Sequence, residues 1–171
     1  MDIVTIHDKR AAAILKKKLA LISFEAKDRS DLRKLVRDMR LKMREAEGVG
    51  LSANQIGLDM KLFVAEVPSE EGRRKFYAMV NPEIIKVGEE LNVAEEGCLS
   101  IPGMYGPVER KEKITVSGFD LNGKKIKIKA WGFLARVFQH EIDHLNGILI
   151  SDRAEKLYPL SQSERLKARQ K

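Results

Sequence analysis

The sequence has 171 residues and a net charge of +7, with 43% hydrophobic and 33% charged residues. This balance is typical of a folded globular domain and excludes a disordered chain. No apolar run approaches the ~18 residues of a membrane-spanning helix, and a single cysteine excludes an internal disulfide framework. We therefore expect one soluble domain over residues 1–171 in a reducing cytoplasm, because the first residues lack the layout of a secretory signal.

The excess of basic residues bears on possible partners, since lysine and arginine bind phosphate chains through counterion release. Here the basic residues are spread along the chain and interleaved with 25 acidic ones, as on a solvated surface. We expect no direct role on DNA and no nucleic acid as the main substrate. A modest attraction to an RNA-rich partner is the alternative.

The first regular elements are one helix and three strands. An amphipathic helix is predicted from Ser30 to Glu47, with Gly48 as its stop. A strand is predicted over 61–67, and two more over 76–80 and 83–87, with Asn81-Pro82 as a break between them. The apolar stripe of the helix consists of Leu32, Leu35, Val36, Met39, Met43 and Ala46.

A glycine-rich segment, GVGLSANQIG at 48–57, lies between the helix and the first strand. Glycines at alternate positions allow a positive φ or the close approach of another chain, and Gln55 offers an amide donor of the kind that stabilises an oxyanion. A phosphate-binding loop is the competing interpretation, although the segment lacks a Gly-Lys-Ser/Thr ending. The segment alone does not decide between the two.

Cys98 is predicted to lie in a loop, within the segment EEGCLS at 95–100. A lone cysteine is usually a small buried hydrophobe, but these neighbours also suit a metal ligand. A thiolate there would favour iron, zinc, nickel or cobalt over magnesium. Local chemistry leaves both interpretations open.

A β-hairpin is predicted next, from Ile114 to Phe119 and from Lys125 to Lys129. Its turn is the sequence DLNG at 120–123. Lysine alternates with isoleucine in the second strand, so we expect one face of the hairpin to be in water.

The most informative element is a helix predicted from Gly132 to Asn146. Apolar residues cover most of its girth, which indicates a helix inside the protein. Its sequence HEIDH places His140 and His144 one turn apart, with Cβ atoms ~5–6 Å apart, close enough to share one cation. Glu141 leans toward the same ion and is placed to take a proton from a bound water. A catalytic site usually has three protein ligands and an open position, and Cys98 is the candidate for the third.

The end of the sequence has the pattern of a short basic helix. Ser161-Gln162-Ser163-Glu164 resembles a capping box, and four basic residues follow by residue 171. This helix is either a docking surface or a solvated terminal helix, which is the commoner case.

Three blocks of sequence together resemble the peptide deformylases: GVGLSANQ at 48–55, EGCLS at 96–100 and QHEIDH at 139–144. The similarity covers about residues 30–153, and it is more specific than the histidine motif because it includes a cysteine as third ligand. Three places depart from the family pattern. Ser52 replaces a common alanine, residues 6–10 differ, and 100–105 lack a basic residue that some members carry.

The resemblance implies an α+β fold in which antiparallel β-sheets pack around a central helix with the HExxH motif. A further N-terminal amphipathic helix and a C-terminal helix complete this single catalytic domain, residues 1–171. The implied reaction removes the formyl group from the N-terminal formyl-methionine of newly made polypeptides and releases formate. A zinc endopeptidase that uses the same HExxH helix is the alternative. A structural metal site would need a fourth protein ligand, and the chain has no second cysteine.

The resemblance also implies the roles of the site residues. One divalent ion would be held by Cys98, His140 and His144. It is usually Fe²⁺ in the family, and Zn²⁺, Ni²⁺ or Co²⁺ can substitute. A metal-bound water would attack the formyl carbon, with Glu141 as general base and then general acid. The ion, the Gln55 amide and the backbone N–H of Leu99 would stabilise the oxyanion.

The remaining expectations concern the substrate and its delivery. A pocket for the methionine side chain is expected at Val49, Phe133, Val137 and the ring of His140, although core packing is the alternative for Phe133 and Val137. The backbone of Gly50 could pair with the peptide as an added strand, and Glu96 could orient a metal ligand. The partners are formyl-methionyl nascent peptides, with a ribosome contact through the basic C-terminal helix.

Overall fold

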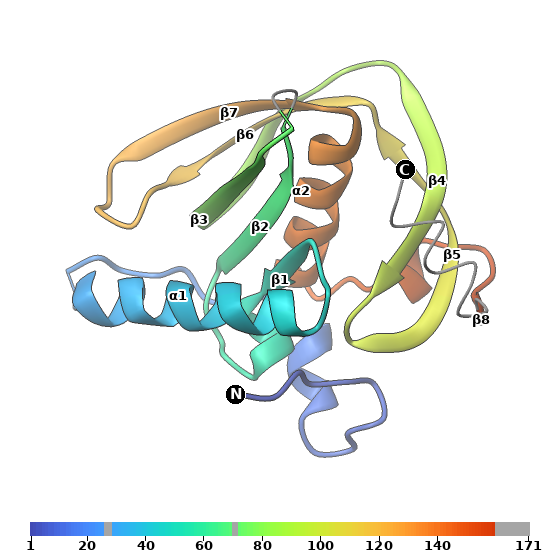
Figure 1. The fold of residues 1–171 in the computed structure, drawn as a ribbon, viewed down its shortest axis with the longest axis horizontal. Coiled ribbons are helices and arrows are strands. Elements are labelled where there is room, and N and C mark those ends of the chain that lie inside the picture. The colour runs from blue at the N-terminus through green and yellow to red at the C-terminus, as the bar shows by residue number, and fades with distance from the viewer. Residues whose placement is uncertain (26–28, 70–71, 160–171) are drawn as a thin grey trace.

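The computed structural model describes residues 1–25, 29–69 and 72–159, which form two antiparallel sheets and two α-helices (Figure 1). The helices are α1 (Arg29–Glu45) and α2 (Gly132–Leu145), with 3-10 turns at η1 (Ala12–Lys16), η2 (Ala53–Ile56) and η3 (Ile150–Asp152). The strands are β1 (Gly50–Ser52), β2 (Leu62–Pro68), β3 (Arg74–Val87), β4 (Leu91–Cys98), β5 (Ile101–Lys111), β6 (Lys113–Phe119), β7 (Lys125–Trp131) and β8 (Tyr158–Pro159).

The strands form a five-stranded sheet in the order β1-β2-β3-β6-β7 and a three-stranded sheet in the order β4-β5-β8. Every pairing is antiparallel. These sheets and the two helices confirm the predicted α+β class.

The two helices pack on opposite faces of the five-stranded sheet, because side chains alternate between faces along each strand. Phe63 of β2 joins a buried cluster with Phe138 of α2, whereas its neighbour Val64 joins a second cluster with Met39 of α1. α2 also contacts β5, and Figure 1 shows it between the large sheet and the long β4–β5 hairpin. Side chains on two sides of α2 can therefore meet both sheets.

The helices predicted over 30–47 and 132–146 are both present, within two residues at each end. The stop of α1 differs in detail, because the residue with a left-handed backbone is Glu47, at φ 55°, and not Gly48. A Cβ at Gly48 would lie 2.8 Å from Leu99 Cδ1, so a larger residue here would have to displace the Leu99 side chain. Gly147 follows α2 with φ 78° and its N–H bonds the carbonyl of His144, as expected of a stop.

The predicted break at Asn81-Pro82 is wrong, because β3 runs continuously from Arg74 to Val87. The strand absorbs the proline with a bulge, seen as a register shift between Val80 and Glu83 against β6. Asn81 has φ 50°, and its side-chain amide both accepts from the N–H and donates to the carbonyl of Ile22, each at 2.9 Å. The bulge thus holds the N-terminal segment against the sheet.

The β4–β5 hairpin is the main element that sequence reasoning missed. Cys98 is the last residue of β4 and not part of a loop. Five of the eight residues of β4 are exposed, the apolar Leu91 and Val93 among them, so its sequence lacks the sustained alternation of apolar and polar residues that marks a strand. The predicted hairpin of β6 and β7 is confirmed, and the C-terminal helix expected over 161–171 lies outside the described residues. None of the described helices is long and apolar enough to cross a membrane.

We expect Phe138→Ala to lower the free energy of unfolding by about 3–5 kcal/mol. The Phe138 ring is fully buried, with centroids 5.3 Å from Phe63 and 5.2 Å from Tyr77. Phe133→Ala on the same helix is the control, since Phe133 is 52% exposed and should change stability by less than about 0.5 kcal/mol. Urea denaturation measures both, and equal losses would contradict this account of the core.

Candidate metal centre

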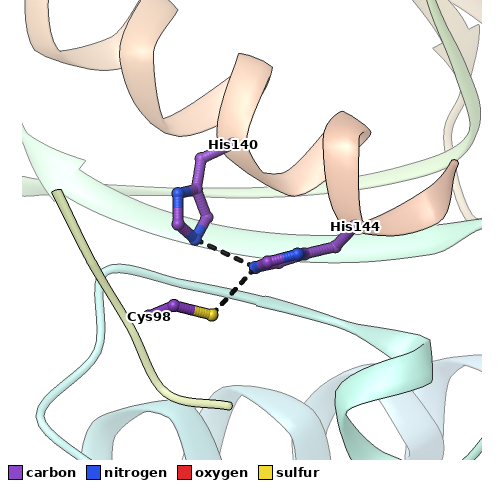
Figure 2. Close-up of side chains that lie close together, drawn as sticks. All are labelled: Cys98, His140 and His144. Carbon is purple, nitrogen blue, oxygen red and sulfur yellow. Dashed lines mark hydrogen bonds between the residues drawn. The ribbon is translucent and has the colours of Figure 1, made fainter. Parts of the chain in front are cut away.

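Three potential metal ligands converge where α2 meets the end of β4. The Nε2 atoms of His140 and His144 are 3.0 Å apart, and Cys98 Sγ lies 3.2 Å from His144 Nε2 (Figure 2). All three atoms lie within 4.8 Å of one another. Ligand bonds to zinc-like ions are ~2.0–2.3 Å, so one ion between the three atoms is within reach of each.

The outer nitrogens of the two histidines are both occupied. His140 Nδ1 faces Glu96 Oε2 at 3.0 Å, and His144 Nδ1 faces the carbonyl of Ile148 at 3.0 Å. These acceptors favour the N–H on Nδ1 and leave the Nε2 lone pairs directed at each other and at the sulfur. Such lone pairs repel unless a positive charge lies among them. A divalent cation fits this requirement, and the S, N, N donor set suits iron, zinc, nickel or cobalt.

The pKa shifts of the cluster residues also favour a positive charge between them. Burial works to raise the pKa of the Cys98 thiol, but the charges and hydrogen bonds of His144 and His140 outweigh it and lower the pKa to about 5. Burial works to lower the pKa of His140, yet its contacts with Cys98 and Glu96 raise it well above its ordinary value. The site therefore carries a thiolate and attracts positive charge.

Glu96 connects the metal ligands to a buried charge network. Its carboxylate accepts a bidentate pair from Arg110, with both N···O distances 2.9 Å, and a further bond from Arg136 at 2.8 Å. Arg110 also bonds Asp143 of α2, which accepts from Arg153. Burial alone would raise the pKa of Glu96, but the hydrogen bonds from His140 and Arg110 keep it well below its usual range.

This network explains the polar residues of α2, a helix that the sequence predicted to be mostly apolar. Arg136, Gln139 and Asp143 are all buried, and each has partners on β4 or β5 or in the network. Sequence reasoning singled out Glu96 but missed Arg110 and Arg136. The one available signal was a charged residue on a helix that is otherwise apolar, since such a residue must find a buried partner.

Glu141 is buried beside the cluster, and its Oε2 atom is one of two buried side-chain atoms with no hydrogen-bond partner among the described residues. Burial raises its pKa to about 7, although the nearby charges of His140 and His144 act to lower it. Its space depends on Gly50 of β1, where a Cβ would lie 2.2 Å from Glu141 Oε1. The close approach expected of the alternate glycines is thus made by Gly50 to this carboxylate.

Gln55 lies on the sulfur side of the cluster, with its amide Nε2 3.6 Å from Cys98 Sγ and 3.2 Å from Ser100 Oγ. Its Oε1 accepts from the backbone N–H of Ser52 at 3.0 Å, which fixes the amide orientation. Leu99 is in the turn between β4 and β5, adjacent to Cys98. The donors predicted at Gln55 and Leu99 therefore lie next to the ligands, while their roles stay predictions.

A cavity of about 810 Å³ opens over the cluster. Its lining includes all four residues predicted to bind substrate and the metal-site residues Cys98, His140 and Glu141; the four are Val49, Gly50, Phe133 and Val137. Phe133 is half exposed at the cavity, whereas Val137 is buried and also belongs to the core cluster. The cavity thus joins an apolar wall to a metal centre.

Comparison with known proteins decides which family combines these features. A sequence profile of the polypeptide deformylases matches residues 1–159.

This chain belongs to the polypeptide deformylase family.

Individual relatives agree with this assignment. The chain is 46% identical over 154 residues to the peptide deformylase of Symbiobacterium thermophilum, a match that covers 90% of this chain and 68% of that protein. It resembles a crystal structure of the Synechococcus elongatus peptide deformylase in complex with actinonin, with a TM-score of 0.81, 35% identity and coverage of 99% and 84%. It also resembles a Met-Ala-Ser-bound peptide deformylase from Acinetobacter baumannii, with a TM-score of 0.81, 34% identity and coverage of 90% and 97%.

The deformylase is a metal-dependent hydrolase that removes the N-formyl group from newly made polypeptides. The predicted family and reaction are confirmed, and the zinc endopeptidase alternative finds no support in these comparisons. The Cys98, His140 and His144 cluster, together with the family, indicates a single bound metal ion.

We expect Gly50→Ala to slow formate release at least about tenfold, because the added Cβ would displace the Glu141 carboxylate from its position. The variant should keep its metal content, since no ligand is changed. The control is a double-mutant cycle with Glu141→Ala. In a protein that already carries Glu141→Ala, the change Gly50→Ala should cause no further loss of rate. A further tenfold loss in the double variant would show that Gly50 acts independently of Glu141.

Proposed function

We propose that the deformylase holds one divalent ion with Cys98, His140 and His144 and moves protons through Glu141 during hydrolysis of the formyl amide. The observation that carries this proposal is the convergence of three lone pairs beside a buried carboxylate with a free oxygen. When bound, the ion lowers the pKa of a coordinated water and polarises the formyl carbonyl. Among the metals that suit this donor set, we propose Fe²⁺ as the native ion.

In the proposed reaction, Glu141 accepts a proton from the water that attacks the formyl carbon and then delivers it to the departing amine nitrogen. The C–N bond breaks, and the products are formate and a free N-terminus. Burial of the carboxylate and its raised pKa suit a group that both accepts and returns a proton near neutral pH. The unpartnered Oε2 atom supplies the accepting position.

We assign stabilisation of the developing oxyanion to the Gln55 amide and the backbone N–H of Leu99. The support is that Gln55 Nε2 lies at the sulfur side of the cluster and that Ser52 holds its Oε1. A donor fixed before the reaction costs no reorganisation as charge develops. Loss of one such donor typically costs about 3–4 kcal/mol of transition-state stabilisation.

The methionine side chain of the substrate is proposed to lie against Val49, Phe133, Val137 and the His140 ring, which line the cavity beside the metal ligands. The Gly50 backbone would pair with the following residues of the peptide, since β1 is an edge strand of the large sheet. The Acinetobacter relative binds Met-Ala-Ser, which is the product expected from its formylated counterpart. Main-chain pairing would make recognition tolerant of residues after methionine.

The same proposal extends to the helix, the domain and the cellular setting of the enzyme. α2 would serve as the central helix that carries HExxH, and residues 1–171 would act as one catalytic domain in the cytoplasm, where formylated chains emerge. The basic segment 161–171 would contact the ribosome. Co-sedimentation with ribosomes of a chain that lacks residues 161–171 tests this contact, and undiminished binding would remove it.

Glu141→Gln should lower kcat for formyl-Met-Ala by about 10²–10⁴-fold, because glutamine cannot accept the proton. Glu95→Gln is the matched control, since Glu95 also lines the cavity but is exposed. Formate release and metal content are measured on both variants. Undiminished deformylation by Glu141→Gln with its metal retained would remove the general-base assignment.

Protein prepared without oxygen should contain about one iron per chain. Exposure to air should abolish formate release, whereas Ni²⁺- or Co²⁺-substituted protein should keep it, because a ferrous site beside a thiolate is sensitive to oxidation. Cys98→Ser should lose most of the bound metal, as measured by elemental analysis. Full metal occupancy in Cys98→Ser would contradict the proposed ligand set.

A further inference from the structure

One half of a sheet face carries a row of basic side chains that the deformylation site does not use. α1 covers this face over β1 and β2, and its cluster extends to Phe119 at the end of β6. Lys125, Lys127 and Lys129 of β7 lie on the same face, because they pair with Phe119, Ser117 and Thr115 of β6. All three lysines are exposed, and Figure 1 places the β6–β7 hairpin at the edge of the molecule.

The basic row extends inward from the edge strand. Lys113 of β6 pairs with Trp131, and Lys86 of β3 pairs with Thr115, so both lysines share the face and both are exposed. Lysines on an edge strand commonly prevent edge-to-edge aggregation. That role does not account for Lys86 and Lys113, because β3 and β6 are interior strands.

The flank of α1 beside this face is also basic. Arg33 donates to Asn122 in the β6–β7 turn at 2.5 Å, which directs this side of the helix toward the hairpin. Arg29 and Arg37 lie one helical turn before and after Arg33, and all three are exposed. Alternate lysines on a strand are ~6.6 Å apart, and arginines four residues apart on a helix are ~6 Å apart. Two basic rows of similar period therefore border one surface.

Acidic residues offset only part of this charge. Glu83 shares the face through its pairing with Ser117, and Glu90 forms a 3.5 Å ion pair with Lys113. Trp131 lies at the end of the lysine row and is 58% exposed. A basic surface with an exposed aromatic ring is the combination that binds single-stranded nucleic acid, through phosphate contacts and base stacking.

We propose that this surface, formed by Arg29, Arg33, Arg37, Lys86, Lys113, Lys125, Lys127, Lys129 and Trp131, binds single-stranded segments of RNA. The lysines contact phosphates, and Trp131 stacks on a base. None of these residues lines the catalytic cavity, so RNA and the formylated peptide bind at separate places. The enzyme can therefore be held near RNA-rich particles that produce its substrate while its cavity stays open.

The test is binding of a labelled oligouridylate to the full chain by fluorescence anisotropy over a series of KCl concentrations. The variant K125Q/K127Q/K129Q should bind more weakly, and the slope of log K against log[salt] should become shallower by about 2, since each phosphate contact on a single strand contributes ~0.7. Trp131→Ala should weaken binding about tenfold at unchanged slope. K125R/K127R/K129R should restore binding, because arginine keeps the charge.

The matched control is K9Q/K18Q/K156Q, which removes the same charge from exposed lysines elsewhere on the chain. Equal weakening in both triple variants would overturn the proposal, because net charge alone would then explain binding. Tighter binding of polyglutamate or of phosphatidylserine vesicles than of oligouridylate would also overturn it, in favour of an acidic protein or a membrane. Loss of all RNA binding on removal of residues 161–171 would assign it to that segment instead.

Formate release from formyl-Met-Ala by each variant shows whether the fold and catalytic site are intact. We expect unchanged kcat in the lysine variants, since their side chains point away from the α2 face of the sheet. RNA binding and deformylation are thus measured separately. A variant that loses RNA binding but keeps formate release contradicts neither the assigned catalytic roles nor the metal ligands, and the reverse result leaves the RNA proposal standing.

Discussion

The structure depends on the anchoring of α2 to the β4–β5 hairpin by a buried set of paired charges. The Glu96 carboxylate accepts hydrogen bonds from Arg110 and Arg136 and lies against His140 Nδ1. Arg110 also donates to Asp143 on the helix. Removing one member of such a buried set leaves an unpaired charge that costs ~3–5 kcal/mol. The set therefore fixes the position of β4 relative to α2. That position is what brings the Cys98 sulfur within 3.2 Å of His144.

The two sheets contribute different parts of the site. The five-stranded sheet supplies the apolar cluster on which α2 packs and the edge strand that leaves room for Glu141. The smaller sheet supplies the sulfur ligand and most of the polar contacts to the helix. Precise ligand geometry comes from residues whose own side chains are held by further hydrogen bonds, as His140 is by Glu96 and His144 by the Ile148 carbonyl.

The sequence was sufficient for α2, for the β6–β7 hairpin and for the convergence of Cys98, His140 and His144, because each has a strong local pattern or a close family resemblance. It was insufficient for β4, whose exposed residues carry no alternation, and for the continuity of β3 through Pro82. The hydrogen-bond partners of Arg136 and Asp143 could not be predicted from the sequence either. The two residues were visible only as polar side chains on a mostly apolar helix, and the strand residues that they bond are 28 to 44 residues away in the chain. Pairings of that separation are set by the tertiary fold, which no local pattern encodes.

The bulge at Asn81 shows how a side chain can replace a missing strand. Its carboxamide presents one acceptor and one donor at the spacing of a peptide group, and Ile22 bonds both. Aspartate would keep the acceptor alone, and glycine would suit the positive φ but offer neither. Asparagine is thus the residue that meets both demands at once. The Asn81 side chain thus makes the pair of hydrogen bonds that one residue of a neighbouring strand would make, and residues 17–25 lie beside the sheet without forming a strand.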